Sequence, residues 1–237
     1  MTRRILLVSS STCHPTAYLD HAEEEIRRAL GPIGRVLFLP WALFDRDAYA
    51  AKVRERFGRM GYEVESAHRT PCPARAVEEA EAVFVGGGNT FRLLKNIDEL
   101  DVIEPLRRRV REGMPYVGTS AGSNVAGATI GTTNDMPIVQ PRSFSGLALV
   151  PFNINPHYRD PDPASTHKGE TRDERIAQFL EENEIPVLAL REGAMLRVEE
   201  GRATIEGRTG GRLFRRGRPA LELATGDRID GLVDIPE

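Results

Sequence analysis

The chain has 237 residues, enough for one large domain with a substantial core or for two small ones. Its net charge of −3, from 32 basic and 35 acidic residues, gives no general attraction to nucleic acid or to an anionic membrane. No stretch is long and apolar enough to span a bilayer. We therefore expect neither nucleic acid nor membrane as a partner.

The cysteines and the N-terminus indicate a reducing compartment. The two cysteines, Cys13 and Cys72, lie in no C-x-x-C motif or Cys/His cluster, so the sequence predicts neither a zinc site nor a disulfide framework. The apolar run at 5–8 follows two arginines but is too short for a signal peptide, and serines follow it directly. We expect a buried first strand and a cytoplasmic protein.

The first two-thirds of the chain alternate between apolar strand patterns and amphipathic helix patterns. Such alternation, with continuous apolar strands, is typical of an α/β fold whose mostly parallel sheet carries helices on both faces. The expected strands are 5–9, 36–40, 62–67, 82–88 and 115–119, and the expected helices are 18–30, 47–60, 73–82, 90–95, 103–112 and one that begins at 121.

The last third has a different pattern. A strand over 147–155 is expected to run into a loop around 155–157, followed by an amphipathic helix over 170–182. Short strands separated by glycines are then predicted at 186–190, 195–200, 203–207 and 212–217. With no linker or repeat in the sequence, we interpret these strands as a C-terminal antiparallel extension of a single domain that spans 1–237.

The segment GTSAG at 118–122 directly follows a buried strand. G-x-S-x-G is typical of a nucleophile elbow, a strained turn that exposes a serine hydroxyl above the sheet. The alternative is a tight turn in which small residues simply fit. GGGNT at 86–90 ends the neighbouring strand, so the amides of Gly88 and Ala121 are candidates for an oxyanion hole beside Ser120. A phosphate cradle is less favoured, because the segment lacks the P-loop lysine and the dinucleotide-binding spacing.

A serine nucleophile needs a base, and an acid must orient that base. Of the five histidines, His157 in NPHY is favoured over His167, and Asp135 and Glu192 both remain candidates for the acid. In ordinary α/β-hydrolases the histidine comes late, after the acid. No histidine follows His167 here, so a triad would have a different layout.

Several segments together resemble the peptidase E group of peptidase family S51, the α-aspartyl dipeptidases. The similarity also covers the first strand and the REG segment at 191–193, and it weakens after about Gly207. The segments are VGGGNTFRLLK (85–95), GTSAGSN (118–124), TTNDMPIV (132–139), INPHY (154–158) and HKGETRDERI (167–176).

This resemblance implies a cytoplasmic serine exopeptidase that cleaves Asp-Xaa dipeptides without a metal or other cofactor. It also implies a fold like that of class I glutamine amidotransferases. In those enzymes a cysteine occupies the elbow position at which this chain has Ser120. The family's serine, histidine and glutamate then fall on Ser120, His157 and Glu192. Asp135 remains the alternative orienting acid or a substrate-binding residue.

Two further residues are candidates for binding an Asp-Xaa substrate. Arg172, in the HKGETR segment, would bind the aspartate side chain, because a guanidinium can bind both carboxylate oxygens. The alternative for Arg172 is a surface salt bridge. Asn89 or a nearby acid would hold the free α-amine. Members of the family can form homodimers. A cyanophycinase-like peptidase and a catalytically silent ligand-binding protein remain the alternatives to a dipeptidase.

Overall fold

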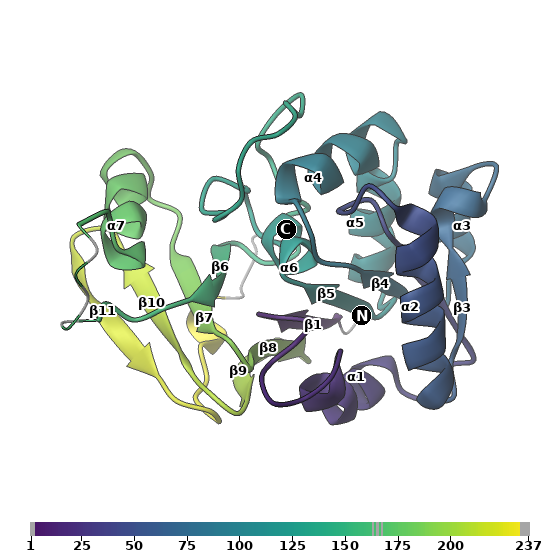
Figure 1. Ribbon diagram of the computed structural model, residues 1–237, viewed down its shortest axis with the longest axis horizontal. Coiled ribbons are helices and arrows are strands. Elements are labelled where there is room, and N and C mark those ends of the chain that lie inside the picture. The colour runs from purple at the N-terminus through teal and green to yellow at the C-terminus, as the bar shows by residue number, and fades with distance from the viewer. Residues whose placement is uncertain (1–2, 163, 165, 167, 233–237) are drawn as a thin grey trace.

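Two sheets of unequal size form the framework of the protein (Figure 1). The computed structural model describes residues 3–162, 164, 166 and 168–232. Helices cover the larger sheet, while the smaller sheet lies beside it and carries the last long helix, as Figure 1 shows. The sequence therefore folds as the predicted α/β protein with a mostly parallel sheet.

The larger sheet has seven strands in the order β3-β2-β4-β5-β1-β8-β9. From β3 to β1 the strands are parallel, and β8 and β9 are added in antiparallel orientation. The inner strands are apolar throughout because helices cover both faces. The strands are β1 (Arg4–Val8), β2 (Arg35–Leu39), β3 (Glu63–Ser66), β4 (Val83–Val85), β5 (Tyr116–Thr119), β8 (Ala194–Glu199) and β9 (Arg202–Gly207).

Each face of the larger sheet packs against its own set of helices. Two helices, α1 (Glu23–Leu30) and α2 (Arg46–Arg59), cover one face and bury Ile26 and Phe57 there. The opposite face is covered by α3 (Pro73–Glu79), α4 (Thr90–Glu99), α5 (Ile103–Arg111) and α6 (Ala121–Ala126). The helix expected from residue 18 begins later, because Leu19 has a φ of 60° and a short 3₁₀ turn, Asp20–Ala22, precedes α1.

The smaller sheet has the strand order β11-β10-β7-β6 and belongs to the last third of the chain. β6 (Asn153–Tyr158) and β7 (Val187–Arg191) are parallel, and β10 (Gly211–Arg215) and β11 (Arg218–Leu223) are antiparallel. The predicted C-terminal extension is thus divided between two sheets. β11 was not predicted, because most of its residues are exposed and give no alternating apolar pattern.

The segment NPHY was expected in a loop but lies in strand β6. Between Asn155 and Tyr158, β6 carries one residue more than the paired part of β7, so the strand contains a bulge. His157 lies in this bulge with a φ of 54°. The Asn-Pro pair that suggested a loop therefore marks an irregular strand. After it, α7 (Arg172–Glu182) begins at a capping box formed by Thr171 and Glu174.

Candidate active site

The turn between β5 and α6 holds Ser120 in a strained conformation. Its φ is 50° and its ψ is −107°, and its N–H donates to the Val8 carbonyl at 3.0 Å. A non-glycine residue with positive φ is costly and persists where the surroundings fix it. The glycines of GTSAG allow the close packing, because a Cβ on Gly122 would overlap the Val85 carbonyl. The turn thus has the geometry of a nucleophile elbow.

His157 and Glu192 complete a line of hydrogen bonds that starts at Ser120. The Nε2 atom of His157 lies 3.0 Å from Ser120 Oγ, and its Nδ1 atom lies 3.1 Å from Glu192 Oε1. His157 comes from β6, and Glu192 directly follows β7. A nucleophile, a base and a carboxylate are therefore within hydrogen-bond reach of one another.

A residue that the sequence analysis did not identify, Ser9, holds the backbone of His157. Ser9, fully buried just after β1, accepts a hydrogen bond from the His157 N–H at 2.9 Å. Its hydroxyl donates in turn to the Leu190 carbonyl at 2.9 Å, two residues before Glu192. One hydroxyl thus joins the first strand to both strands that carry the base and the acid. Its position at the carboxyl end of a central parallel strand is the only sequence signal that could have indicated it.

Asp135 is held by a different part of the site. Its Oδ2 accepts from the Thr90 N–H at 2.7 Å, from the Thr90 hydroxyl at 2.6 Å and from the Thr133 hydroxyl at 3.3 Å. These contacts place the carboxylate at the N-terminus of α4, where the helix dipole favours negative charge. His157 makes its Nδ1 contact with Glu192 instead. Asp135 still lines the same cavity as Ser120 and His157.

The two candidate oxyanion-hole amides flank Ser120. Gly88 has a φ of 139°, and a Cβ there would lie 2.6 Å from the Ala42 carbonyl, so the position requires glycine. Ala121 is the first residue of α6, where an N–H has no acceptor within the helix. Among the described residues neither N–H has a hydrogen-bond partner. Both amides are therefore free to donate to a ligand.

The remaining predicted residues of the described chain do not line the cavity over Ser120. Asn89 caps α4, since its side chain accepts from the Arg92 N–H at 3.0 Å and donates to the Met136 carbonyl at 2.8 Å. Arg172 lines a separate cavity of about 570 Å³ with Arg159 and Arg175. Burial, followed by the like charges of Arg175 and Arg159, lowers the pKa of Arg172. The alternative base, His167, lies outside the described residues.

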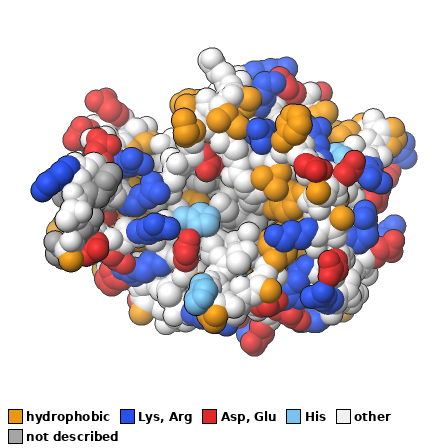
Figure 2. All heavy atoms as spheres, viewed as in Figure 1, with side chains coloured by type: hydrophobic (Ala, Val, Ile, Leu, Met, Phe, Trp, Pro, Cys, Tyr) orange, Lys and Arg blue, Asp and Glu red, His pale blue; other side chains and the backbone are white. Residues whose placement is uncertain are grey.

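The cavity over Ser120 has a volume of about 850 Å³ and is open to solvent. Figure 2 shows the molecule hollowed near the centre of this face, with histidine side chains beside the hollow and hydrophobic ones across from them. The lining residues are Ser11, Tyr18, Leu43, Phe44, Asp45, Ala48, Tyr49, Lys52, Gly87, Gly88, Arg92, Ser120, Asp135 and His157.

Comparison with known proteins identifies the family. The family model described as peptidase family S51 matches residues 5–206. The chain belongs to peptidase family S51. Peptidase E of Streptomyces coelicolor is 52% identical over 98% of this chain and 95% of its own length. A probable alpha-aspartyl dipeptidase of Drosophila melanogaster is 48% identical over 94% of each chain.

Solved structures support the fold of this S51 member. A peptidase from an acI-B1 actinobacterium has a TM-score of 0.69 and covers 97% of each chain at 17% identity. A structure from Listeria monocytogenes, also 17% identical, has a TM-score of 0.67 and covers 88% of this chain and all of its own. The predicted resemblance to peptidase E and the predicted α/β fold are thereby confirmed.

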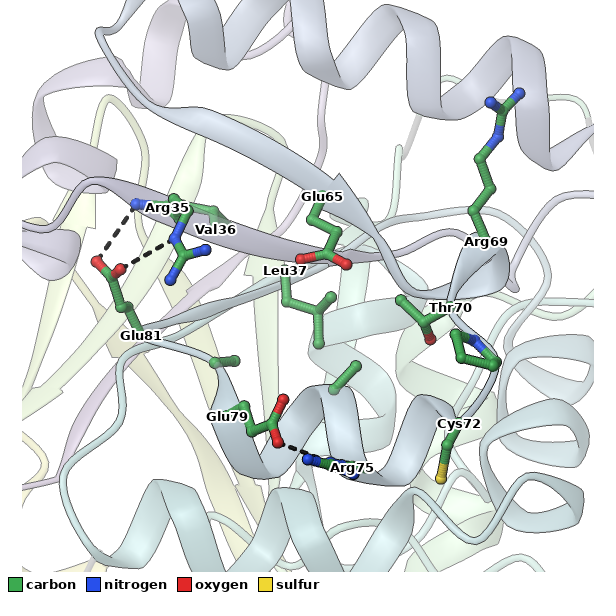
Figure 3. A pocket seen from close by; sticks show the side chains of 13 residues that line it. Arg35, Val36, Leu37, Glu65, Arg69, Thr70, Cys72, Arg75, Glu79 and Glu81 are labelled. Atoms are coloured by element: carbon green, nitrogen blue, oxygen red, sulfur yellow. Dashed lines mark hydrogen bonds and ion pairs between the residues drawn. The ribbon is translucent and has the colours of Figure 1, made fainter.

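A second cavity of this S51 protein lies between α3 and strands β2 and β3 and has a volume of about 400 Å³ (Figure 3). Its charges are largely matched within its own wall: Arg35 pairs with Glu81 at 3.3 Å, and Arg75 pairs with Glu79 at 2.7 Å. Cys72 lies at its edge in Figure 3. The lining of this cavity contains no serine or histidine, so it offers no Ser-His pair like that of Ser120 and His157.

Two searches of the structure bear on cofactor and membrane. In the part of the chain that the structure describes, no group of three or more His, Cys, Asp or Glu side chains could hold a metal ion. Nor does any helix in that part have the length and apolar character needed to cross a bilayer.

Proposed function

We propose that this protein is a serine exopeptidase that hydrolyses dipeptides with an N-terminal aspartate, using Ser120, His157 and Glu192 as its triad. The continuous contact from Ser120 Oγ to His157 Nε2 at 3.0 Å, and from Nδ1 to Glu192 at 3.1 Å, carries the proposal. Relatives named peptidase E and alpha-aspartyl dipeptidase support the reaction class and the substrate.

Acylation begins with Glu192 accepting a hydrogen bond from the Nδ1–H of His157, which leaves a lone pair on Nε2. As Ser120 Oγ bonds to the scissile carbonyl carbon, its proton moves to Nε2 and the carbonyl π electrons move to oxygen. The Gly88 and Ala121 amides donate to that oxyanion. The C–N bond then breaks, and the imidazolium gives its proton to the departing amine.

Deacylation uses the same groups in reverse. His157 removes a proton from water as the water oxygen attacks the ester carbonyl of the aspartyl-enzyme. The second tetrahedral intermediate collapses, the bond to Ser120 Oγ breaks, and the serine takes the proton back from His157. Free aspartate leaves, and no metal or cofactor takes part in these steps.

Two groups are assigned to the aspartyl residue of the substrate, and a third, Asn89, positions the helix beside it. Asp135 lies in the cavity, and the described residues engage only its Oδ2, so Oδ1 is available to the free α-ammonium. Asn89 acts through its two hydrogen bonds, which hold the start of α4 beside Met136. Arg172 binds the side-chain carboxylate, because it lines the cavity beside α7 and no carboxylate of the described residues pairs with it.

A small substrate panel tests this function: Asp-Leu, Glu-Leu, Asn-Leu and N-acetyl-Asp-Leu. We expect rapid hydrolysis of Asp-Leu and much slower hydrolysis of the other three, because they lack the correct carboxylate or the free amine. Ser120→Ala protein is the control for contaminating peptidases. Lack of Asp-Leu turnover by folded protein would favour a silent ligand-binding protein. Preferential turnover of an aspartate–arginine polymer would favour a cyanophycinase-like enzyme.

We also propose that the protein acts in the cytoplasm and that it forms a homodimer. Fractionation of cells and light scattering of the purified protein test these two points.

A further inference from the structure

Two cationic side chains line the catalytic cavity and have no role in the chemistry above. They are Lys52 of α2 and Arg92 of α4. Within the described ranges, no carboxylate lies within ion-pair distance of either one. The Lys52 ammonium lies 4.1 Å from the centre of the Tyr18 ring, and the Arg92 guanidinium lies 5.9 Å from the centre of the Phe44 ring. Aromatic rings thus hold both cations without neutralising them.

The two carboxylates of this cavity, Asp45 and Asp135, have hydrogen-bond partners other than these cations. Asp45 caps α2, where its Oδ1 accepts from the Ala48 N–H at 2.9 Å. Asp135 is held by Thr90 at the start of α4. Unpaired cations that line a catalytic cavity favour an anionic ligand. No existing ion pair has to be broken when such a ligand binds.

A second group of cations lies on the other side of the elbow. Arg159, Arg172 and Arg175 line the cavity beside α7, beyond β6, together with Asp160, Asp162 and Glu170. Arg175 pairs with Glu170 at 3.6 Å, whereas no described carboxylate lies within ion-pair distance of Arg172. Figure 1 shows α7 and the smaller sheet on one side of α6 and α2 on the other, with α4 above α6. Cationic side chains without an ion-pair partner among the described residues therefore lie on either side of α6, with Lys52 on the α2 side and Arg172 on the α7 side.

The proposed substrate has a matching distribution of charge. An Asp-Xaa dipeptide carries one carboxylate on the aspartyl side chain, before the scissile bond, and one at the C-terminus, after it. A peptide bound across Ser120 places these carboxylates on opposite sides of the nucleophile. Each flank can then bind one of them.

The side chains that line the two cavities indicate which substrate carboxylate each cavity binds. Leu43 and Phe44 line the same cavity as Lys52 and Arg92, and Phe44 is 87% exposed. A wide apolar wall suits a leaving residue whose side chain varies, whereas a pocket specific for aspartate requires polar groups close around a short side chain. The α2 and α4 flank therefore fits the leaving residue.

We propose that Lys52 and Arg92 bind the C-terminal carboxylate of the leaving residue and so restrict the enzyme to dipeptides. The inference rests on the proposed function, and it adds to that function a subsite for the anionic end of the substrate. Neither residue touches the reacting atoms, so both determine specificity through binding.

The test compares two substrates that differ only at this carboxylate, Asp-Leu and Asp-leucinamide. Each is measured with the unaltered enzyme and with Lys52→Met, Arg92→Met and Arg54→Met. Arg54 is the matched control, because it is an exposed cation on the same helix as Lys52 and does not line the cavity.

We expect at least one of the single variants Lys52→Met and Arg92→Met to lower kcat/KM for Asp-Leu by about 10-fold. The change should come mainly from a higher KM, because the contact with the carboxylate is the same in the ground state and the transition state. Turnover of Asp-leucinamide should stay the same, which also shows that the variants are folded. Arg54→Met should change neither substrate.

The outcomes separate this inference from the proposed function. An unaltered enzyme that cleaves Asp-Leu, with both cavity variants keeping the original ratio of Asp-Leu to Asp-leucinamide, would overturn the carboxylate subsite alone. An unaltered enzyme that cleaves neither substrate would overturn the proposed function as well.

Discussion

The larger sheet and the smaller sheet contribute different parts of the site by different means. The larger sheet supplies Ser120 and the Gly88 and Ala121 amides from turns whose shape is determined by adjacent glycines. The smaller sheet supplies His157 from a bulge and Glu192 from a strand end, and both positions depend on the pairing of β6 with β7. The proposed nucleophile is thus positioned by local features of the chain, while the positions of the proposed base and acid depend on long-range structure.

The two sheets meet at the back of the histidine. The hydroxyl of Ser9, next to the central strand β1, accepts a hydrogen bond from the His157 N–H and donates one to the Leu190 carbonyl. The Ser120 N–H is bonded to Val8, the neighbour of Ser9. Consecutive residues of one strand end therefore position both the nucleophile and the base, so substitutions on the two sides should affect catalysis in different ways.

The largest effect is expected from the local half of the site. Ser120→Ala should lower kcat by about 10⁴-fold or more, because the nucleophile is lost, while leaving the melting temperature unchanged. Ser123→Ala is the control, because this hydroxyl bonds only to the Val8 and Gly118 carbonyls. Steady-state kinetics on Asp-Leu measures both, and near-normal turnover by folded Ser120→Ala protein would remove the mechanism.

The acid in the smaller sheet should give the next largest effect. Glu192→Gln should lower kcat by about 10²- to 10⁴-fold with little change in KM, because the histidine loses the carboxylate that fixes its tautomer and stabilises its cation. Asp135→Asn should instead reduce the preference for substrates with a free α-amine. If Asp135→Asn gave the pure loss of kcat and Glu192→Gln the loss of amine selectivity, the two assignments would be reversed.

The link between the sheets is expected to have an intermediate effect. Ser9→Ala should lower kcat by about 10- to 100-fold with KM nearly unchanged, because His157 is no longer held at its backbone N–H. Ser123→Ala also removes a buried hydroxyl with two hydrogen bonds and serves as the matched variant. If the melting temperature fell by a similar amount in Ser9→Ala and Ser123→Ala and kcat stayed unchanged in both, Ser9 would have only a structural role.

Substrate recognition beside the smaller sheet should give the smallest effect. Arg172→Lys should lower kcat/KM for Asp-Leu by about 10-fold, equivalent to about 1.4 kcal/mol, because an ammonium cannot bind two carboxylate oxygens at once. The preference for Asp-Leu over Asn-Leu should shrink with it. Arg175→Lys is the control from the same helix. A variant at Arg172 that kept both its rate and its preference would show that another group binds the aspartate.

The same division explains what could be predicted from the sequence. GTSAG and GGGNT predicted the turns at Ser120 and Gly88 because the glycine spacing that makes them is local. The interpretation of NPHY as a loop was wrong, because Asn and Pro occur in bulges as well as in turns, and only the pairing with β7 distinguishes the two.

Long-range contacts account for what the sequence left open. Glu192 and Asp135 could not be separated by sequence distance, since their positions relative to His157 depend on the packing of β7 and of α4. Ser9 was not predicted, because a serine at the end of a strand is common and its partners lie 148 and 181 residues away. The family resemblance favoured Glu192 through a match of only three residues.

The most direct test of a triad shared by the two sheets is the reactivity of a thiol placed at the elbow. In Ser120→Cys protein at about pH 6, iodoacetamide should alkylate the introduced thiol more than about 10-fold faster than Cys72, because a nearby histidine favours the thiolate. Peptide mass spectrometry resolves the sites, and exposed Cys72 is the internal reference. Adding His157→Ala or Glu192→Gln should remove most of this advantage, whereas Asp135→Asn should leave it intact. Equal alkylation of the elbow thiol in all four proteins would contradict a triad of Ser120, His157 and Glu192.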